Sequence, residues 1–264
     1  MLQSPLLVID KSFAHATSAD QLTALSTKYI FVVPSAFYYE VFDPESAKRL
    51  QSLTGLREFR RVPIPILLRR ETESGQPARE TDLPRFMVNP KVLSPDWKLS
   101  PDELEIVRRH KIELVEPLVR FWNSVIDHGV IGFSGAELRA ARRTEKEFVA
   151  LCETLRDPNR IRMIAAKIAF PHSAILDETW LHYRKLQTWI LQGLILWRRY
   201  QNSADMRSTE NIEHDTHDIE YLMLGLHAGN LATAETSEKL SKASMGWRFK
   251  LLKPQGRLLT PELV

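Results

Sequence analysis

The sequence predicts a three-layer α/β/α fold whose mainly parallel central sheet is interrupted in the chain by a large α-helical insertion. Near the N-terminus, the apolar runs LLVI (6–9) and YIFVV (29–33) have the composition of strands buried on both faces. Each is followed by a helical pattern after a short connection, which favours parallel strands joined by right-handed crossovers. From about residue 215, the sequence again predicts the elements of an α/β unit, a helix followed by a short apolar strand.

The two N-terminal units carry clear stop and start signals. The first strand ends at Asp10, and SADQLTAL (18–25) predicts a short helix. The second strand stops at Pro34, and Ser35 is a good N-cap for a helix in AFYYEVF (36–42). These segments predict the order strand, helix, strand, helix.

The middle of the chain has a different character. RVPIPILL (61–68) is expected to be a third strand at an edge of the sheet, because its prolines do not suit a central position. A proline-rich polar stretch follows, and helices are expected at about residues 101–127, 134–156, 158–169 and 177–201. We therefore expect a discontinuous α/β domain, residues 1–60 and 206–264, and a helical insertion, residues 61–205, packed on it.

The last part of the chain predicts four more elements. DTHDIEYLMLGLHAGN (215–230) is expected to be a helix with one apolar face that Gly229 stops. LATA (231–234) predicts a short buried strand, TSEKLSKAS (236–244) a helix and WRFKLL (247–252) a final strand.

Composition indicates an ordinary globular protein and excludes several other classes. Of 264 residues, 44% are hydrophobic and 26% charged, and the net charge is +3, as in an ordinary globular protein. The single cysteine, Cys152, excludes an internal disulfide framework and a cysteine-rich zinc site. The most apolar run, WILQGLILW (189–197), is too short to span a bilayer, and the N-terminus shows no secretory signal pattern. A cytoplasmic protein with no membrane partner is expected.

Four acidic residues fall where an open parallel sheet collects its ligands, outside the carboxyl ends of the strands. Asp10 ends the first strand, Glu40 lies about one turn into the helix after the second, and Glu235 follows LATA. Asp218 lies in the first turn of the preceding helix if that helix begins near Asp215. We therefore expect the four carboxylates to converge in one crevice.

Such a cluster points to metal chemistry. Ionised carboxylates gathered in one place repel one another strongly, and the hard cations Mg²⁺ and Mn²⁺ relieve that repulsion. Two such ions about 4 Å apart can activate a water and stabilise the leaving oxygen in phosphodiester cleavage. The expected cofactor is therefore Mg²⁺ or Mn²⁺.

These blocks carry a family resemblance. LLVIDKSF (6–13), YIFVVPSAFYYEVF (29–42), HDTHDIEYLMLGLHAGNLATAE (214–235) and WRFKLL resemble the successive motifs of PIN-domain nucleases. The resemblance covers about 100 residues in two segments. It implies a Mg²⁺- or Mn²⁺-dependent nuclease, often acting on RNA, in a family that includes many bacterial toxins. Matched one by one, Asp10, Glu40 and Asp218 take the first three acidic positions and Glu235 the last.

Two features depart from the family pattern. T-A-E stands where the family has T-x-D, so the fourth carboxylate is one methylene longer, and Glu238 is a possible substitute for Glu235. The long helical insertion also makes the chain larger than a minimal toxin, so the toxin role does not transfer directly.

Several neighbouring side chains are candidates for supporting roles. Ser12 could bind a phosphate oxygen or hold Asp10, as hydroxyls beside metal carboxylates commonly do, and Thr233 is a similar candidate. Lys11 could bind phosphate. Asp215 either caps the helix or, if the helix begins earlier, lies on its buried face and contacts the metal.

Several histidine and arginine side chains are further candidates for contacts with phosphate. His214 and His217 are expected to be exposed at the helix start, with a role near phosphate as the alternative. Arg139, Arg142 and Arg143 would suit phosphate contacts if they faced the crevice, but an exposed helix surface is the expected place.

The leading hypothesis is a metal-dependent endoribonuclease whose partner is nucleic acid, with an antitoxin or another protein partner and a homodimer as further possibilities. One alternative is a non-catalytic PIN-like scaffold, which the change to Glu235 favours. Another is an HD-type phosphohydrolase, because HDTHD contains His-Asp pairs. That architecture is all-helical and gives no reason for LLVI or YIFVV to be strands.

Overall fold

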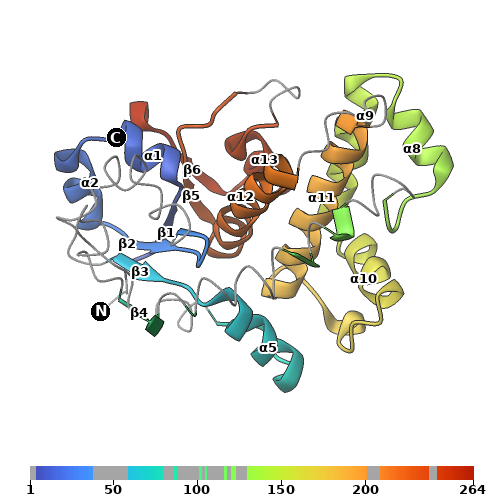
Figure 1. Ribbon diagram of the computed structural model, residues 1–264, viewed down its shortest axis with the longest axis horizontal. Helices are drawn as coiled ribbons and strands as arrows, with labels where there is room; N and C mark the ends of the chain where they lie inside the picture. The colour runs from blue at the N-terminus through green and yellow to red at the C-terminus, as the bar shows by residue number, and fades with distance from the viewer. Residues whose placement is uncertain are drawn as a thin grey trace.

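The computed structural model confirms an α/β fold built on a parallel sheet (Figure 1). It describes residues 4–37, 59–79, 86–87, 101–102, 105, 116–117, 120–122, 130–200, 209–237 and 243–264. The sheet order is β4-β3-β2-β1-β5-β6, and all neighbours pair in parallel except the two-residue edge strand β4. The strands are β1 (Leu6–Ile9), β2 (Ile30–Val33), β3 (Phe59–Arg61), β4 (Phe86–Met87), β5 (Asn230–Ala232) and β6 (Arg257–Leu259).

Helices cover both faces of this sheet. Helices α1 (Lys11–Ala16) and α2 (Ala19–Ser26) lie on one face, and α12 (Thr209–Ala228) and α13 (Met245–Leu252) lie on the other (Figure 1). All four residues of β1 are buried, as the apolar run predicted. Ser18 and Gln21 form a reciprocal capping box that begins α2 at the predicted place.

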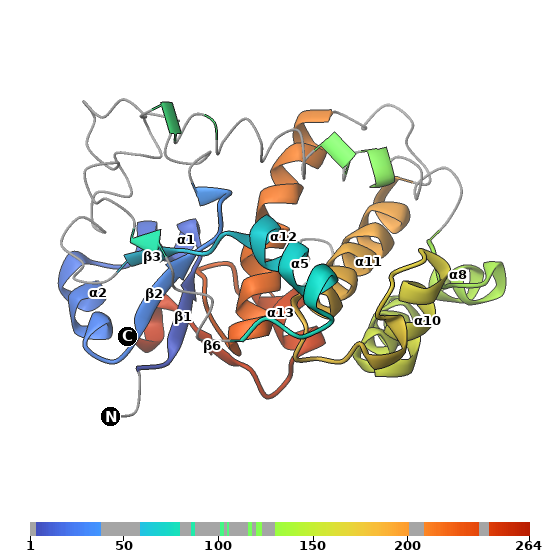
Figure 2. The ribbon, with the colours of Figure 1, turned by 90° about the horizontal axis from the view of Figure 1, so that it is seen from below.

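The insertion supplies a second group of helices beside α12 (Figure 2). They are α5 (Ile64–Ser74), α8 (Gly135–Ala141), α9 (Glu145–Glu153), α10 (Pro158–Lys167) and α11 (Leu181–Tyr200), with 3-10 turns η5 (Thr154–Arg156) and η6 (Ser173–Ile175). A third 3-10 turn, η8 (Pro261–Leu263), ends the chain. Helix α11 packs on both α12 and α5, and it carries a buried apolar stripe formed by Tyr183, Leu186, Ile190 and Leu194. One continuous hydrophobic core therefore joins the sheet to the insertion.

Two expected strands are helices. RVPIPILL contributes only its first residue to β3 and then forms α5, because Pro65 at the first turn of a helix leaves no useful hydrogen bond unmade. WRFKLL lies in α13, which Ser244 caps by accepting from the amide of Trp247 at 3.3 Å. The last strand is instead β6, five residues further on.

Helix α12 begins earlier than its sequence indicated. It starts at Thr209 and ends before Gly229, whose φ of 79° stops it as expected. Asp215 is therefore inside the helix, so the capping interpretation of Asp215 is wrong. Asp218 likewise lies well past the first turn.

Other expectations meet different outcomes. The segment 134–156 forms α8 and α9 rather than one helix, whereas α10 and α11 match their predictions. Most of the segment 101–127, most of AFYYEVF and the centre of TSEKLSKAS lie outside the described residues. Within the described part of the chain, no helix is long and apolar enough to cross a membrane.

Candidate functional site

The carboxyl ends of β1 and β5 form the point where the sheet changes direction. From β1 the chain continues to β2 on one side, while β5 pairs with β1 on the other. Open α/β sheets bind ligands in the crevice at such a switch point. The register pairs Ile9 with Ala232, so Asp10 and Thr233, the next residue on each strand, meet there.

The Asp10 carboxylate is held by two hydroxyl groups. Its side chain is buried, and its Oδ2 accepts hydrogen bonds from Ser12 Oγ and, at 2.8 Å, from Thr233 Oγ1. Asp10 stands at the N-cap position of α1, but its side chain makes no capping hydrogen bond to that helix. Both hydroxyl groups donate to Oδ2, and neither of them donates to Oδ1.

Backbone amides fix the direction of both hydroxyl protons. The amide of Ala234 donates to Ser12 Oγ at 3.0 Å, and the amide of Glu235 donates to Thr233 Oγ1 at 3.1 Å. Each hydroxyl has one proton, and both protons point at Asp10. The loop after β5 is therefore linked to the Asp10 carboxylate through Ser12 and Thr233. Holding Asp10 is one of the two roles expected of Ser12, and the other, binding a phosphate oxygen, stays a prediction.

An ionised Asp10 carboxylate without a counter-ion is disfavoured at this site. Burial raises the pKa of the Asp10 carboxyl above its ordinary value, the hydrogen bonds from Ser12 and Thr233 counteract the rise, and the negative charge of Glu235 adds to it. A bound cation would relieve both the burial and the repulsion between Asp10 and Glu235.

Glu235 occupies an exposed position at the start of α13. Its Oε2 accepts from the amide of Met245 at 3.3 Å, and its backbone oxygen accepts from the amide of Gly246 at 2.9 Å. A Cβ on Gly246 would lie only 2.7 Å from that oxygen, so glycine permits this close approach. Glu235 therefore lies beside Asp10 with its carboxylate near a helix N-terminus, which stabilises negative charge.

The remaining predicted residues are placed less completely. Asp218 lies half-buried on α12, which packs against β1, and Lys11 is the first residue of α1. Glu40, Glu238 and the side chains of Asp215 and His214 lie outside the described residues. Among the side chains that the structure describes, no group of three or more His, Cys, Asp or Glu could hold a metal ion.

The donor chemistry of the site nevertheless suits a hard cation. Asp10, Ser12, Thr233 and Glu235 offer only oxygen atoms, the ligands that Mg²⁺ and Mn²⁺ prefer. These residues fit such an ion by type, and a complete ligand set would need a third carboxylate from those placed less completely.

Glu220 is a buried acid at the same edge of the sheet that the sequence did not single out. This α12 side chain is 1% exposed, and its Oε2 accepts from the amide of Ala36 at 3.0 Å, just beyond β2. Nearby, Arg61 Nη1 donates to Ser35 Oγ at 3.3 Å. A glutamate inside the apolar run IEYLMLGL was the available signal, because a charge at such a position is unusual.

The arginines of the insertion lie elsewhere. Arg139, Arg142 and Arg143 are exposed on or directly after α8, at the opposite end of the molecule from the sheet (Figures 1 and 2). The expectation of an exposed helix surface is confirmed for these three residues.

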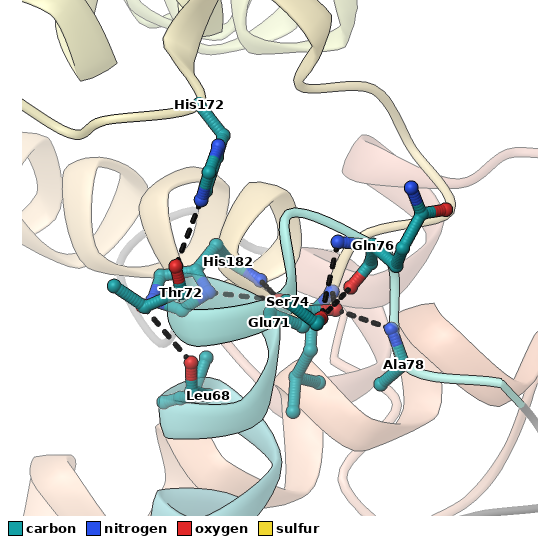
Figure 3. Close-up of polar contacts among 9 residues, drawn as sticks. Leu68, Glu71, Thr72, Ser74, Gln76, Ala78, His172 and His182 are labelled. Atoms are coloured by element: carbon teal, nitrogen blue, oxygen red, sulfur yellow. Dashed lines mark hydrogen bonds and ion pairs between the residues drawn. The ribbon is translucent and has the colours of Figure 1, made fainter.

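A third buried carboxylate, Glu71 on α5, lies at the start of α11 (Figure 3). It accepts from the amides of Ala78, Leu181 and His182 at 2.7, 2.7 and 2.9 Å, and from His182 Nδ1 at 2.8 Å. Burial acts to raise the pKa of Glu71, but the hydrogen bonds from the His182 side chain and the three amides outweigh it and hold the pKa below its ordinary value.

Glu71 has a structural role, because it links α5 to the start of α11, and it does not form a reactive centre. Thr72 Oγ1 lies 3.4 Å from His182 Nε2, so hydroxyl, imidazole and carboxylate stand in sequence (Figure 3). However, that hydroxyl donates to the carbonyl of Leu68 at 3.1 Å, which occupies its proton. The arrangement is an N-terminal cap of α11 supplied by another helix.

Comparison with known proteins finds no matching family model and no similar curated protein or solved structure. The physical case for a function therefore rests on the fold and on the residues at the switch point.

Proposed function

We propose that this protein is a metal-dependent phosphodiesterase, acting on RNA as an endoribonuclease. The observation that carries the proposal is the buried Asp10 carboxylate at the switch point of a parallel sheet, held by Ser12 and Thr233 beside Glu235. Buried charge maintained in this way opposes folding, so a catalytic or binding role is its natural explanation.

The chain's own groups would divide the work. Asp10, Glu40 and Asp218 would hold Mg²⁺ or Mn²⁺, with Asp215 and Glu235 assisting, while Ser12 and Thr233 keep Asp10 in one orientation. When bound, the cation would supply charge neutralisation at the phosphate and a more acidic water. Lys11, half-buried at the start of α1, would bind a phosphate oxygen.

The resemblance to PIN-domain nucleases supports this proposal, and the α/β fold is consistent with it. The observed fold is α/β with five parallel strands, and the sequence blocks that carry the resemblance supply β1, β2 and β5. RNA as substrate, an antitoxin or other protein partner, a homodimer and a cytoplasmic location belong to the proposal as expectations.

RNA cleavage by the purified protein tests the proposal. We expect cleavage with Mn²⁺ or Mg²⁺, none in EDTA, and a loss of at least about 100-fold in Asp10→Asn. Asp20→Asn is the matched control, because Asp20 is an exposed aspartate in the first turn of α2. Cleavage that survives EDTA, or full activity in Asp10→Asn, would refute the proposal.

A non-catalytic scaffold is the second candidate. It is favoured by Glu235, which stands where the resembled family has an aspartate. Calorimetry distinguishes the two, because a scaffold would bind no Mn²⁺, whereas the proposed enzyme would bind it and lose affinity in Asp10→Asn. The HD-type alternative requires an all-helical chain and finds no support in a six-stranded sheet.

A further inference from the structure

A cavity of about 410 Å³ lies between α10 and α11, within the helical insertion and away from Asp10. This size falls within the range of small-molecule sites. Its described lining is apolar and aromatic apart from two basic side chains, and consists of Phe121, Ile131, Ile164, Ile168, Ala169, Phe170, Pro171, His182, Lys185, Leu186, Trp189 and Ile190.

Lys185 gives this cavity its chemical character. Its Nζ lies 4.3 Å from the centre of the Trp189 ring, and no ion pair or hydrogen bond joins it to any described residue. The described lining contains no acidic side chain. Lys185 is half-buried, and a cation partly removed from water among apolar groups is energetically costly unless it has a counter-ion. Consistent with this, burial lowers the pKa of Lys185 to about 8.

Part of the cavity wall is held in place by contacts within the fold. The ring of His182 lies tilted against that of Phe170, with centroids 4.6 Å apart, and Glu71 accepts a hydrogen bond from His182 Nδ1 (Figure 3). Ala169 adopts a left-handed conformation, with φ of 56°, where the chain turns from α10 into this wall. A preformed wall lowers the entropy that binding must overcome.

We propose that this cavity binds a small amphipathic anion, with its apolar body against Phe170, Trp189 and Ile190 and its carboxylate or sulfonate on Lys185 Nζ. Such a ligand would fill the apolar space and pair with Lys185, for which the described part of the lining supplies no acidic side chain. The proposal is independent of the nuclease proposal, because none of its residues lies near Asp10.

Two fluorescent probes test this assignment in the full chain. 1-Anilinonaphthalene-8-sulfonate carries an aromatic body and an anion, and N-phenyl-1-naphthylamine has the same rings without the charge. We expect saturable binding of the sulfonate at one site per chain. Lys185→Met should weaken this binding about tenfold, because it removes a charge-assisted hydrogen bond, and should leave the uncharged probe within about twofold.

Matched variants separate charge from folding. Lys167→Met removes an exposed lysine from neighbouring α10 and should change neither affinity. Lys185→Arg should keep sulfonate binding within about threefold, which shows that the fold survives at this position. Dodecanoate should displace the sulfonate at lower concentration than dodecan-1-ol. Equal weakening of both probes in Lys185→Met, or no saturable binding by the wild type, would overturn the proposal.

Discussion

Thr233 donates its hydroxyl proton to Asp10 Oδ2 over 2.8 Å, joining residues 223 positions apart in the chain. The amide of Glu235 donates to the same hydroxyl, so one threonine links the ends of β1 and β5 to the loop that carries Glu235. These two hydrogen bonds define the candidate site.

Replacing Thr233 with valine should weaken the fold. Valine keeps the shape but leaves the amide of Glu235 without its acceptor and removes one bond to Asp10, so we expect a loss of about 1–2 kcal/mol. Thr233→Ser should recover most of this loss, because serine restores the hydroxyl. Thermal unfolding in EDTA measures both changes, and equal stability of the Val and Ser variants would contradict the role given to the hydroxyl.

Neutralising Asp10 should have the opposite effect on stability. Asn at position 10 removes a buried charge that the fold disfavours, so we expect the melting temperature at pH 7 in EDTA to rise by about 2–4 °C, which corresponds to about 1 kcal/mol for a chain of this length. Asp20→Asn, on the surface, should not change it. A lower melting temperature for Asp10→Asn would mean that the ionised carboxylate is itself stabilising.

Glu220 offers a test of whether the site extends toward β2. Glu220→Gln keeps an oxygen that can accept from the amide of Ala36 but removes the charge. If this carboxylate contributes to cation binding, Mn²⁺ affinity measured by calorimetry should fall at least about tenfold, while the melting temperature in EDTA changes by less than about 2 °C. Unchanged Mn²⁺ affinity would make Glu220 a purely structural acid.

Glu71 should stabilise the protein in a pH-dependent way. Its pKa is lower in the fold than its ordinary value of 4.5, so its contribution is fully present above pH 4.5 and is lost as the pH falls through the folded pKa. Glu71→Ala should cost about 3 kcal/mol at pH 7, because it leaves several buried amides without an acceptor.

Urea unfolding of wild type and Glu71→Ala at pH 7 and pH 3 measures the contribution of Glu71 to stability. The difference in the free energy of unfolding between the two proteins should be smaller at the lower pH. Glu73→Ala, on the exposed side of the same helix, serves as the control. A gap that is the same at both pH values would show that charge at Glu71 is irrelevant.

Lys185 should titrate near pH 8 rather than at its ordinary value of 10.5. Because the folded pKa is the lower one, the charged amine destabilises the fold below pH 8, and this cost disappears as the pH rises toward 10.5. NMR titration of ¹³C-dimethylated lysines should show one resonance moving near pH 8 that Lys185→Met removes. His182 is the other titratable group of the described cavity lining.

Much of the α/β fold followed from the order of elements along the chain. LLVI and YIFVV are apolar at every position, which suits strands covered on both faces, and Ser18 begins a helix through contacts within one turn. WRFKLL was one of two expected strands that are helices: its apolar residues fit a short strand or a helix equally well, and the cap from Ser244 with packing in the core decided for the helix.

The sequence by itself determined that Asp10 ends a buried parallel strand and that Gly229 stops the helix before β5, and it made Ser12 and Thr233 candidates for a supporting role. These conclusions depend on local patterns, which spacing reveals. Only the tertiary structure decided that α12 begins at Thr209, that Glu220 reaches Ala36 and that Glu71 fixes α11. Each of these depends on burial and hydrogen bonds between segments far apart in the chain, and the pairing of distant segments is set by packing rather than by the period of any one of them.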